Sequence, residues 1–204
     1  NAYPLVRDDE ANPYSADYFT LTDLDGVQTL DIALDAPAFA PLIPTEGDGF
    51  FWYSNRGDMG DARLTRAFDL TGVTTASLDY RLWFDIENTW DYGYLTVSDD
   101  GGATWDVLPT PHTTTENPHH VAYGAGYTGL SNGWVEESVS LDAYAGREIL
   151  VRFEMITDDA VTRPGMAIDD VRVDALGYAA DFEAGDSGWH AEGWLRIDNR
   201  LPQR

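Results

Sequence analysis

Apolar and polar residues alternate along much of the chain, in short runs separated by turn-forming residues. In residues 75–86 every even-numbered position is apolar, whereas the odd-numbered positions read Thr, Ser, Asp, Arg, Trp and Asp. Residues 147–156 follow the same period, with apolar side chains at every second position from 149 to 155. A period of two places successive side chains on opposite faces of an extended strand. Both runs therefore predict strands with one buried face.

Shorter runs that alternate or are rich in β-branched and aromatic residues predict further strands. These cover residues 27–34, 50–54, 62–70, 92–98, 104–108, 134–141, 166–173 and 189–197. Turn residues recur between them, and helical periodicity is nearly absent apart from one turn at 141–146. This pattern is typical of a β-sandwich. We therefore expect an all-β protein, a jelly-roll sandwich with extra terminal strands.

Pro- and Gly-rich stretches suggest where the chain divides. Residues 35–49 form such a link, and near Gly177 the strand pattern starts again. We therefore expect an N-terminal β segment and linker at 1–46, a jelly-roll domain at 47–176, and at 177–204 either the opening strand of a following β domain or an exchanged terminal strand. The polar excursion 109–133 is too long for a tight turn and is expected to be a surface loop.

Composition adds a large core and an extreme charge. Hydrophobic residues make up 43% of the 204, with 7 Trp, 11 Tyr and 8 Phe. The 36 acidic residues face 12 basic ones, giving a net charge of −24. Such a charge excludes nucleic acid and anionic membrane surfaces as partners and favours cation binding where carboxylates converge. No apolar run is long enough for a membrane helix, so we expect no membrane insertion. Cysteine is absent, and bound metal often stabilises extracellular domains that lack disulfides.

Two adjacent aspartates interrupt the apolar run at 166–173. If alternate side chains face the core, either Asp169 or Asp170 must do so unless a bulge intervenes. An unpaired buried carboxylate is costly and needs an arginine or a hard cation. Because the chain has many carboxylates and few arginines, we expect structural Ca²⁺ here.

Other carboxylates are candidate ligands of the same ion or of a second one. A Gly-rich turn at 55–61 presents Asp58 and Asp61 together with free carbonyls, and Asp85, Glu87 and Asp91 form another group of carboxylates where a strand becomes a turn. Calcium accepts six to eight oxygens, carbonyls included. The predicted metal ligands are thus Asp58, Asp61, Asp85, Glu87, Asp169 and Asp170.

Catalysis has no support in the sequence. The chain contains no H-E-x-x-H, no G-x-S-x-G and no P-loop, so we expect it not to be an enzyme. Residues 98–105 match a single Asp-box hairpin, which indicates a turn and not glycoside cleavage. Trp90, Tyr92 and Trp134 are candidate members of an aromatic platform for sugar stacking, although such residues also commonly form a core.

Several short strings, in this order and spacing, resemble the MAM-like jelly-roll region of immune inhibitor A type secreted metallopeptidases. They are residues 51–58, 64–72, 83–87, 91–94, 98–105, 133–137 and 167–173. The resemblance covers about residues 47–175, and 189–199 is similar to the start of the VEG domain that follows in that family. It implies a secreted β-sandwich beside a zinc peptidase domain, with calcium as a structural ion and no catalytic zinc in this segment.

Three functions remain open. The first is a non-catalytic, calcium-stabilised extracellular accessory domain that positions a peptidase or engages a protein or a cell-surface glycan. The second is a strand-exchanged extracellular filament protein that self-associates through its terminal strands. The third is a carbohydrate-binding module.

Overall fold

The computed structural model describes residues 4–7, 18–33, 35, 38–43 and 49–202. It divides into two units, residues 1–37 and residues 38–204. The described residues of the first unit contain no strand or helix. The prediction of a strand at 27–34 is therefore wrong for residues 27–33, which pair with no other strand. Val27 instead closes a turn, in which its N–H donates to the Leu24 carbonyl (3.0 Å). Residue 34 lies outside the described part.

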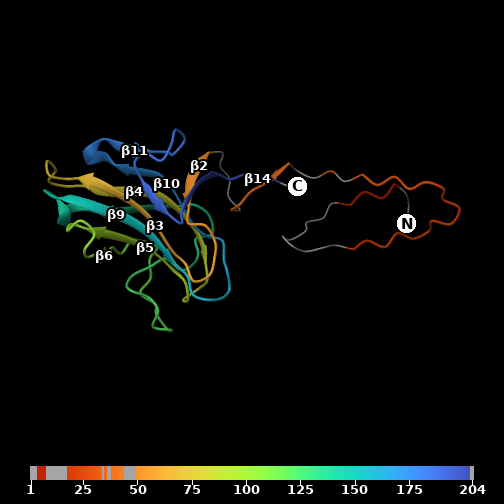
Figure 1. The fold of residues 1–204 in the computed structure, drawn as a ribbon, viewed down its shortest axis with the longest axis horizontal. Coiled ribbons are helices and arrows are strands. Elements are labelled where there is room, and N and C mark those ends of the chain that lie inside the picture. Colours follow the sequence, from red (N-terminus) through yellow and green to blue (C-terminus); the bar gives the residue numbers. More distant parts are fainter. Residues whose placement is uncertain (1–3, 8–17, 34, 36–37, 44–48, 203–204) are drawn as a thin grey trace. The chain divides into compact units, whose positions relative to one another are not determined.

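Two antiparallel sheets form the second unit, and Figure 1 shows them as two layers. The first sheet has the order β13 (Leu195–Asp198), β2 (Phe50–Tyr53), β10 (Gly165–Val173), β4 (Ser77–Ile86) and β7 (Gly129–Leu130), with β11 (Tyr178–Ala180) on β10 and β8 (Val135–Ser140) on β4. The second has the order β12 (His190–Glu192), β3 (Asp61–Asp69), β9 (Glu148–Ile156), β5 (Tyr92–Ser98) and β6 (Asp106–Val107). A ribbon of β1 (Phe39–Ala40) and β14 (Leu201–Pro202), with two 3₁₀ turns, η1 (Asp142–Tyr144) and η2 (Asp174–Leu176), completes the described elements. The all-β sandwich is confirmed.

The core lies between the sheets and follows the predicted alternation. On β9 the side chains at 149, 151, 153 and 155 are buried, and the even positions of β4 are buried too. Trp83 departs from the pattern because a second apolar cluster covers the outer face of the first sheet. This cluster joins Trp83 to Ile43, Phe51, Tyr53 and Ala167. Strands β2 and β10 are therefore buried on both faces, which a simple period of two does not predict.

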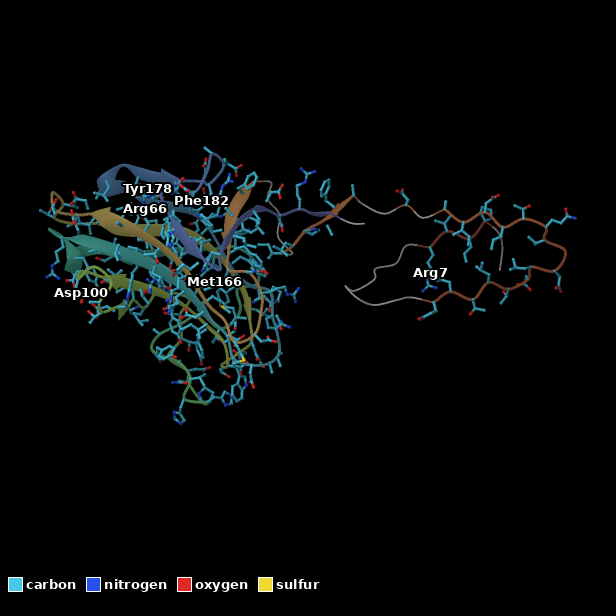
Figure 2. All side chains as sticks on the ribbon, in the orientation of Figure 1. Arg7, Arg66, Asp100, Met166, Tyr178 and Phe182 are labelled. Carbon is cyan, nitrogen blue, oxygen red and sulfur yellow. The ribbon has the colours of Figure 1, made fainter. Side chains whose placement is uncertain are left out.

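The residues after 177 pair with both sheets. β11 extends β10, β13 pairs with β2, and β12 pairs with β3. The predicted strand at 189–197 is split into β12 and β13, because Gly193 (φ 83°) turns the chain between the sheets. The guanidinium of Arg66 on β3 lies 4.2 Å from the ring centre of Tyr178 on β11 (Figure 2), so a cation–π contact joins the two layers.

Asn199 ties the two ends of this unit together. Its Oδ1 accepts hydrogen bonds from the N–H groups of Leu42 (2.7 Å) and Ile43 (2.9 Å), and its Nδ2 donates to the Ile43 carbonyl (2.9 Å). The buried backbone at 42–43 is thus satisfied by one side chain from the far end of the chain. None of the described residues belongs to a helix that is long and apolar enough to cross a membrane.

Candidate metal centre

Three loops meet at one end of the sandwich, and hydrogen bonds join the loop after β2 to the loop after β9. The Thr157 N–H donates to the Gly60 carbonyl (3.0 Å), and the Gly60 N–H donates to Thr157 Oγ1 (2.8 Å). The Met59 N–H donates to the Asp158 carbonyl (2.5 Å). In the antiparallel pair of β3 and β9, Asp61 at the start of β3 lies opposite Ile156 at the end of β9. The segment that enters β3 and the segment that leaves β9 are therefore held side by side.

The third loop connects β4 to β5 and carries Asp91. Its N–H donates to the Glu87 carbonyl (3.2 Å), which tightens the turn. Its Oδ1 accepts the N–H of Asp158 (2.7 Å) from the loop after β9. The hydroxyl of Thr162, in the loop after β9, donates to Asp58 Oδ1 (2.6 Å) and so forms a further bond to the loop after β2.

Carboxylates from two of these loops converge to form the acidic cluster Glu87–Asp91–Asp158. One oxygen from each residue lies within 4.8 Å of the others. Asp91 is buried, with 2% of its surface exposed, and the other two are half-buried. Burial, and to a smaller extent the negative charges of Asp158, Glu87 and Asp58, together raise the pKa of Asp91 to about 6, against the opposing effect of the hydrogen bond from the Asp158 N–H. The acidic cluster therefore carries more negative charge than its own surroundings neutralise.

The donor set fits a hard divalent cation. All three groups are carboxylates, and no histidine or cysteine belongs to the cluster, so zinc is a poor match. Calcium takes six to eight oxygens at 2.3–2.6 Å from carboxylates, carbonyls and water. Three carboxylates supply up to six oxygens, and a cation between them would offset both the desolvation of Asp91 and the mutual repulsion.

Only part of the predicted ligand set lies at this cluster. Glu87 is a member, and Asp58 is close enough for its charge to raise the pKa of Asp91. Asp85 accepts a hydrogen bond from Arg163 Nε (2.8 Å), and Asp61 forms an ion pair with Arg63. An arginine therefore already neutralises each of these last two carboxylates.

Asp169 and Asp170 lie elsewhere, in the body of β10. The ladder with β4 shifts between residues 169 and 172, and Asp170 has a positive φ of 50°. Asp170 Oδ2 lies 3.4 Å from Arg81 Nη1, while Asp169 Oδ1 accepts the N–H of Asp170 (2.8 Å). Burial raises the pKa of Asp169 to about 7. Within the described ranges, neither belongs to a group of three metal-ligating side chains, so calcium at this position stays a prediction.

The ligand set predicted from the sequence omitted Asp91 and Asp158. Asp91 directly precedes β5 and lies in the same acidic turn as Glu87, so the pattern that indicated Glu87 also indicates Asp91. Asp158 stands two residues after the end of β9, where its neighbour Asp159 is also acidic. Acidic residues just beyond strand ends are a usable signal, but which strand ends meet is not visible along the sequence.

The three candidate sugar-stacking rings have different surroundings. Trp90 is 41% exposed and stacks on His119, with ring centres 3.6 Å apart. Tyr92 is buried, and its hydroxyl donates to the Glu116 carbonyl (2.7 Å). Trp134 packs edge-on against Phe51 of the second apolar cluster. Trp90 is therefore the most exposed of the three rings.

Comparison with known proteins places these features in a family context. The family described as immune inhibitor A-like, MAM domain matches residues 25–199. The pre-pro-metalloprotease PrtV of Vibrio cholerae serotype O1 is 26% identical over 193 residues, which cover 94% of this chain and 20% of that protein. Immune inhibitor A of Bacillus thuringiensis subsp. alesti is 27% identical over 121 residues, covering 58% of this chain and 16% of that protein. The chain thus spans about a fifth or less of these relatives.

Proposed function

The chain belongs to the immune inhibitor A-like MAM domain family, and we propose that it is a non-catalytic, calcium-stabilised accessory domain of a secreted metallopeptidase. The observation that carries the calcium proposal is the acidic cluster, in which the buried Asp91 lies close to the carboxylates of Glu87 and Asp158. The accessory role rests on the family and on the absence of catalytic motifs in the sequence.

Calcium would act here as a clamp between loops. The ligands come from the loop after β4 and the loop after β9, and the second is bonded to the loop after β2. An ion that binds the folded chain and not the unfolded one adds RT ln(1 + [Ca²⁺]/Kd) to the free energy of unfolding. At 100 times the Kd this amounts to about 2.7 kcal/mol.

The relatives support the peptidase context. Two of them carry names that describe a metalloprotease and an immune inhibitor, and each is several times longer than this chain. A rigid sandwich placed beside a peptidase could present protein or cell-surface glycan partners to it. We propose an extracellular location on the same grounds.

Thermal unfolding with and without calcium tests the metal proposal. We expect the melting temperature of the wild-type chain to fall when EDTA removes calcium, and titration calorimetry to find binding at the acidic cluster. Asp158→Asn should abolish most of the calcium-dependent shift, because it removes one charged ligand while the amide can still accept the N–H of Ala160. An unchanged melting temperature after chelation would refute the metal proposal.

The matched control is the neighbouring aspartate. Asp159 is exposed and lies outside the acidic cluster. Asp159→Asn removes the same charge one residue away and should leave the calcium-dependent shift intact. Equal losses in the two variants would mean that calcium acts through the general acidity of the surface.

A glycan-binding role has one specific observation in its favour, the exposed ring of Trp90 over His119. Quenching of tryptophan fluorescence by soluble glycans, lost in Trp90→Ala, would support it, and silence across a diverse glycan array would rule it out. Self-association through terminal strands also stays a prediction, which electron microscopy of the purified chain tests; in the structure, β1 pairs with β14 of the same chain.

A further inference from the structure

A pocket of about 530 Å³ lies over β4, β8, the end of β10 and the start of η2, away from the acidic cluster. Most of the side chains that line it are charged. They are Asp79, Arg81, Glu136, Glu137, Arg172 and Asp174. A pocket of this size is typical of sites for small ligands or single side chains.

The register of the first sheet brings these charges together. Asp79 of β4 is directly opposite Arg172 of β10, and Arg81 is directly opposite Glu136 of β8. Residues directly opposite each other project from the same face of a sheet. Since the even positions of β4 fill the core, the odd positions 79 and 81 belong to the outer face.

One of the two positive charges in this pocket, that of Arg81, already has a carboxylate partner. Arg81 lies 3.4 Å from Asp170 and 5.2 Å above the ring of Trp134. Arg172 is exposed and has no ion pair or hydrogen bond from its side chain within the described ranges. The lining therefore contains four carboxylates and two guanidinium groups. One of these guanidinium groups, that of Arg81, also pairs with Asp170, which lies outside the lining.

One of the four lining carboxylates, Glu137, is buried, and this increases the need of the pocket for a cation. The Glu137 side chain has no exposed surface; its Oε1 bonds to His112 Nδ1 (2.9 Å), and its Oε2 has no hydrogen-bond partner among the described residues. A carboxylate held in such low-dielectric surroundings is poorly screened, so Glu137 adds to the negative potential of the pocket.

We propose that this pocket binds a basic side chain, arginine or lysine, presented by a polypeptide partner. The planar guanidinium of arginine can donate to two carboxylates at once, and Glu136, Asp79 and Asp174 rim the pocket on three separate elements. An anion would have to approach four carboxylates on a chain with a net charge of −24. A bare metal ion fits poorly, because within the described ranges no three of these residues bring ligand atoms together.

This inference gives the proposed accessory domain a protein partner, and it does not rest on the calcium ion. The pocket is built from the sheet and not from the loops around the acidic cluster. A basic side chain held here would anchor a target protein near the peptidase.

Fluorescence anisotropy with a labelled Gly-Arg-Gly-Arg-Gly peptide, measured in calcium-containing buffer, tests the proposal. The calcium proposal is tested separately by the melting temperature, so the two can fail independently. We expect saturable binding to the wild-type chain and no binding of the same peptide with citrulline, a neutral isostere, in place of arginine. Glu136→Gln and Asp174→Asn should each weaken binding roughly two- to fivefold. Both side chains belong to exposed residues, so each variant should fold, which circular dichroism verifies.

Glu148→Gln is the control. Glu148 is an exposed glutamate at the start of β9 in the other sheet, and its loss lowers the net negative charge by the same amount. We expect its affinity for the arginine peptide to match the wild type. Equal weakening in Glu148→Gln and Glu136→Gln, equal binding of the citrulline peptide, or no binding by the wild type would each overturn the proposal.

Discussion

Replacing Asp91 with asparagine should have opposite effects on stability with and without calcium. In the absence of an ion, the folded chain holds a carboxyl group whose pKa is raised from 3.8 to about 6, mainly by burial. A raised pKa means that folding disfavours the ionised form, so the ionised group lowers stability at high pH. Asparagine cannot ionise, and its carbonyl can still accept the N–H of Asp158 that Asp91 accepts now.

The magnitude follows from the size of the shift. A rise of about 2 pKa units corresponds to about 3 kcal/mol. Because the folded chain and nearby water relax around a buried charge, we expect about 1–2 kcal/mol of this in unfolding experiments. This loss of stability is absent at a pH below the pKa of Asp91 in the unfolded chain, and it is complete at a pH above the pKa of Asp91 in the folded chain. At pH 5 the unfolded carboxyl is ionised and the folded one still mostly protonated, so about half of the cost is present.

Urea unfolding in EDTA at pH 5 to 8 measures this effect. We expect Asp91→Asn to be more stable than the wild type and the gain to about double from pH 5 to pH 8. With saturating calcium the sign should reverse, because the variant lacks a charged ligand. Asp159→Asn is the control and should show no such pH dependence. A variant that is less stable than the wild type in EDTA at pH 8 would refute the account of Asp91 as an uncompensated buried charge.

Three further substitutions test how the fold is held together. Asn199→Ala removes three hydrogen bonds to the backbone around Ile43 and should cost about 2–3 kcal/mol in urea unfolding; a loss below about 0.5 kcal/mol would contradict the tie between the two ends. Tyr127→Phe deletes a buried hydroxyl that bonds to the Tyr80 hydroxyl (2.6 Å) and should cost about 1–2 kcal/mol, with near-ultraviolet circular dichroism otherwise unchanged. Gly165→Ala should lower the melting temperature, since Gly165 has φ 101° and an added Cβ would lie 2.7 Å from the Asn55 carbonyl oxygen; an unaltered melting temperature would show that the loop yields freely.

The long loop after β6 shows how a polar segment becomes ordered. His112 bonds to the buried Glu137 of β8, and the Tyr92 hydroxyl donates to the Glu116 carbonyl. The side chain of Asn117 accepts the N–H groups of Val121 (2.8 Å) and Ala122 (3.0 Å). Side chains thus satisfy backbone groups that have no strand partner, so the loop needs no core of its own.

Alternation along the chain was enough to predict the sandwich. The period of two at 75–86 and 147–156 corresponds to β4 and β9, two central strands, because each has one face in the same core. The Asp-box pattern likewise determined its hairpin: Asp100 Oδ1 accepts the N–H of Thr104 (2.9 Å), and hydrogen bonds from Thr104 lower the pKa of Asp100. Such features are encoded locally, where residues a few positions apart decide the conformation.

Tertiary structure alone decided which distant residues meet. Glu87, Asp91 and Asp158 converge because β5 and β9 pair in the second sheet while the chain enters β5 from β4 of the first. Trp83 is buried because Ile43 and its neighbours cover the outer face, and residues after 177 join both sheets because Gly193 redirects the chain. Each of these outcomes depends on pairing between segments far apart in sequence. The pattern of one strand specifies its faces but not its neighbours, and therefore not the site that the neighbours form.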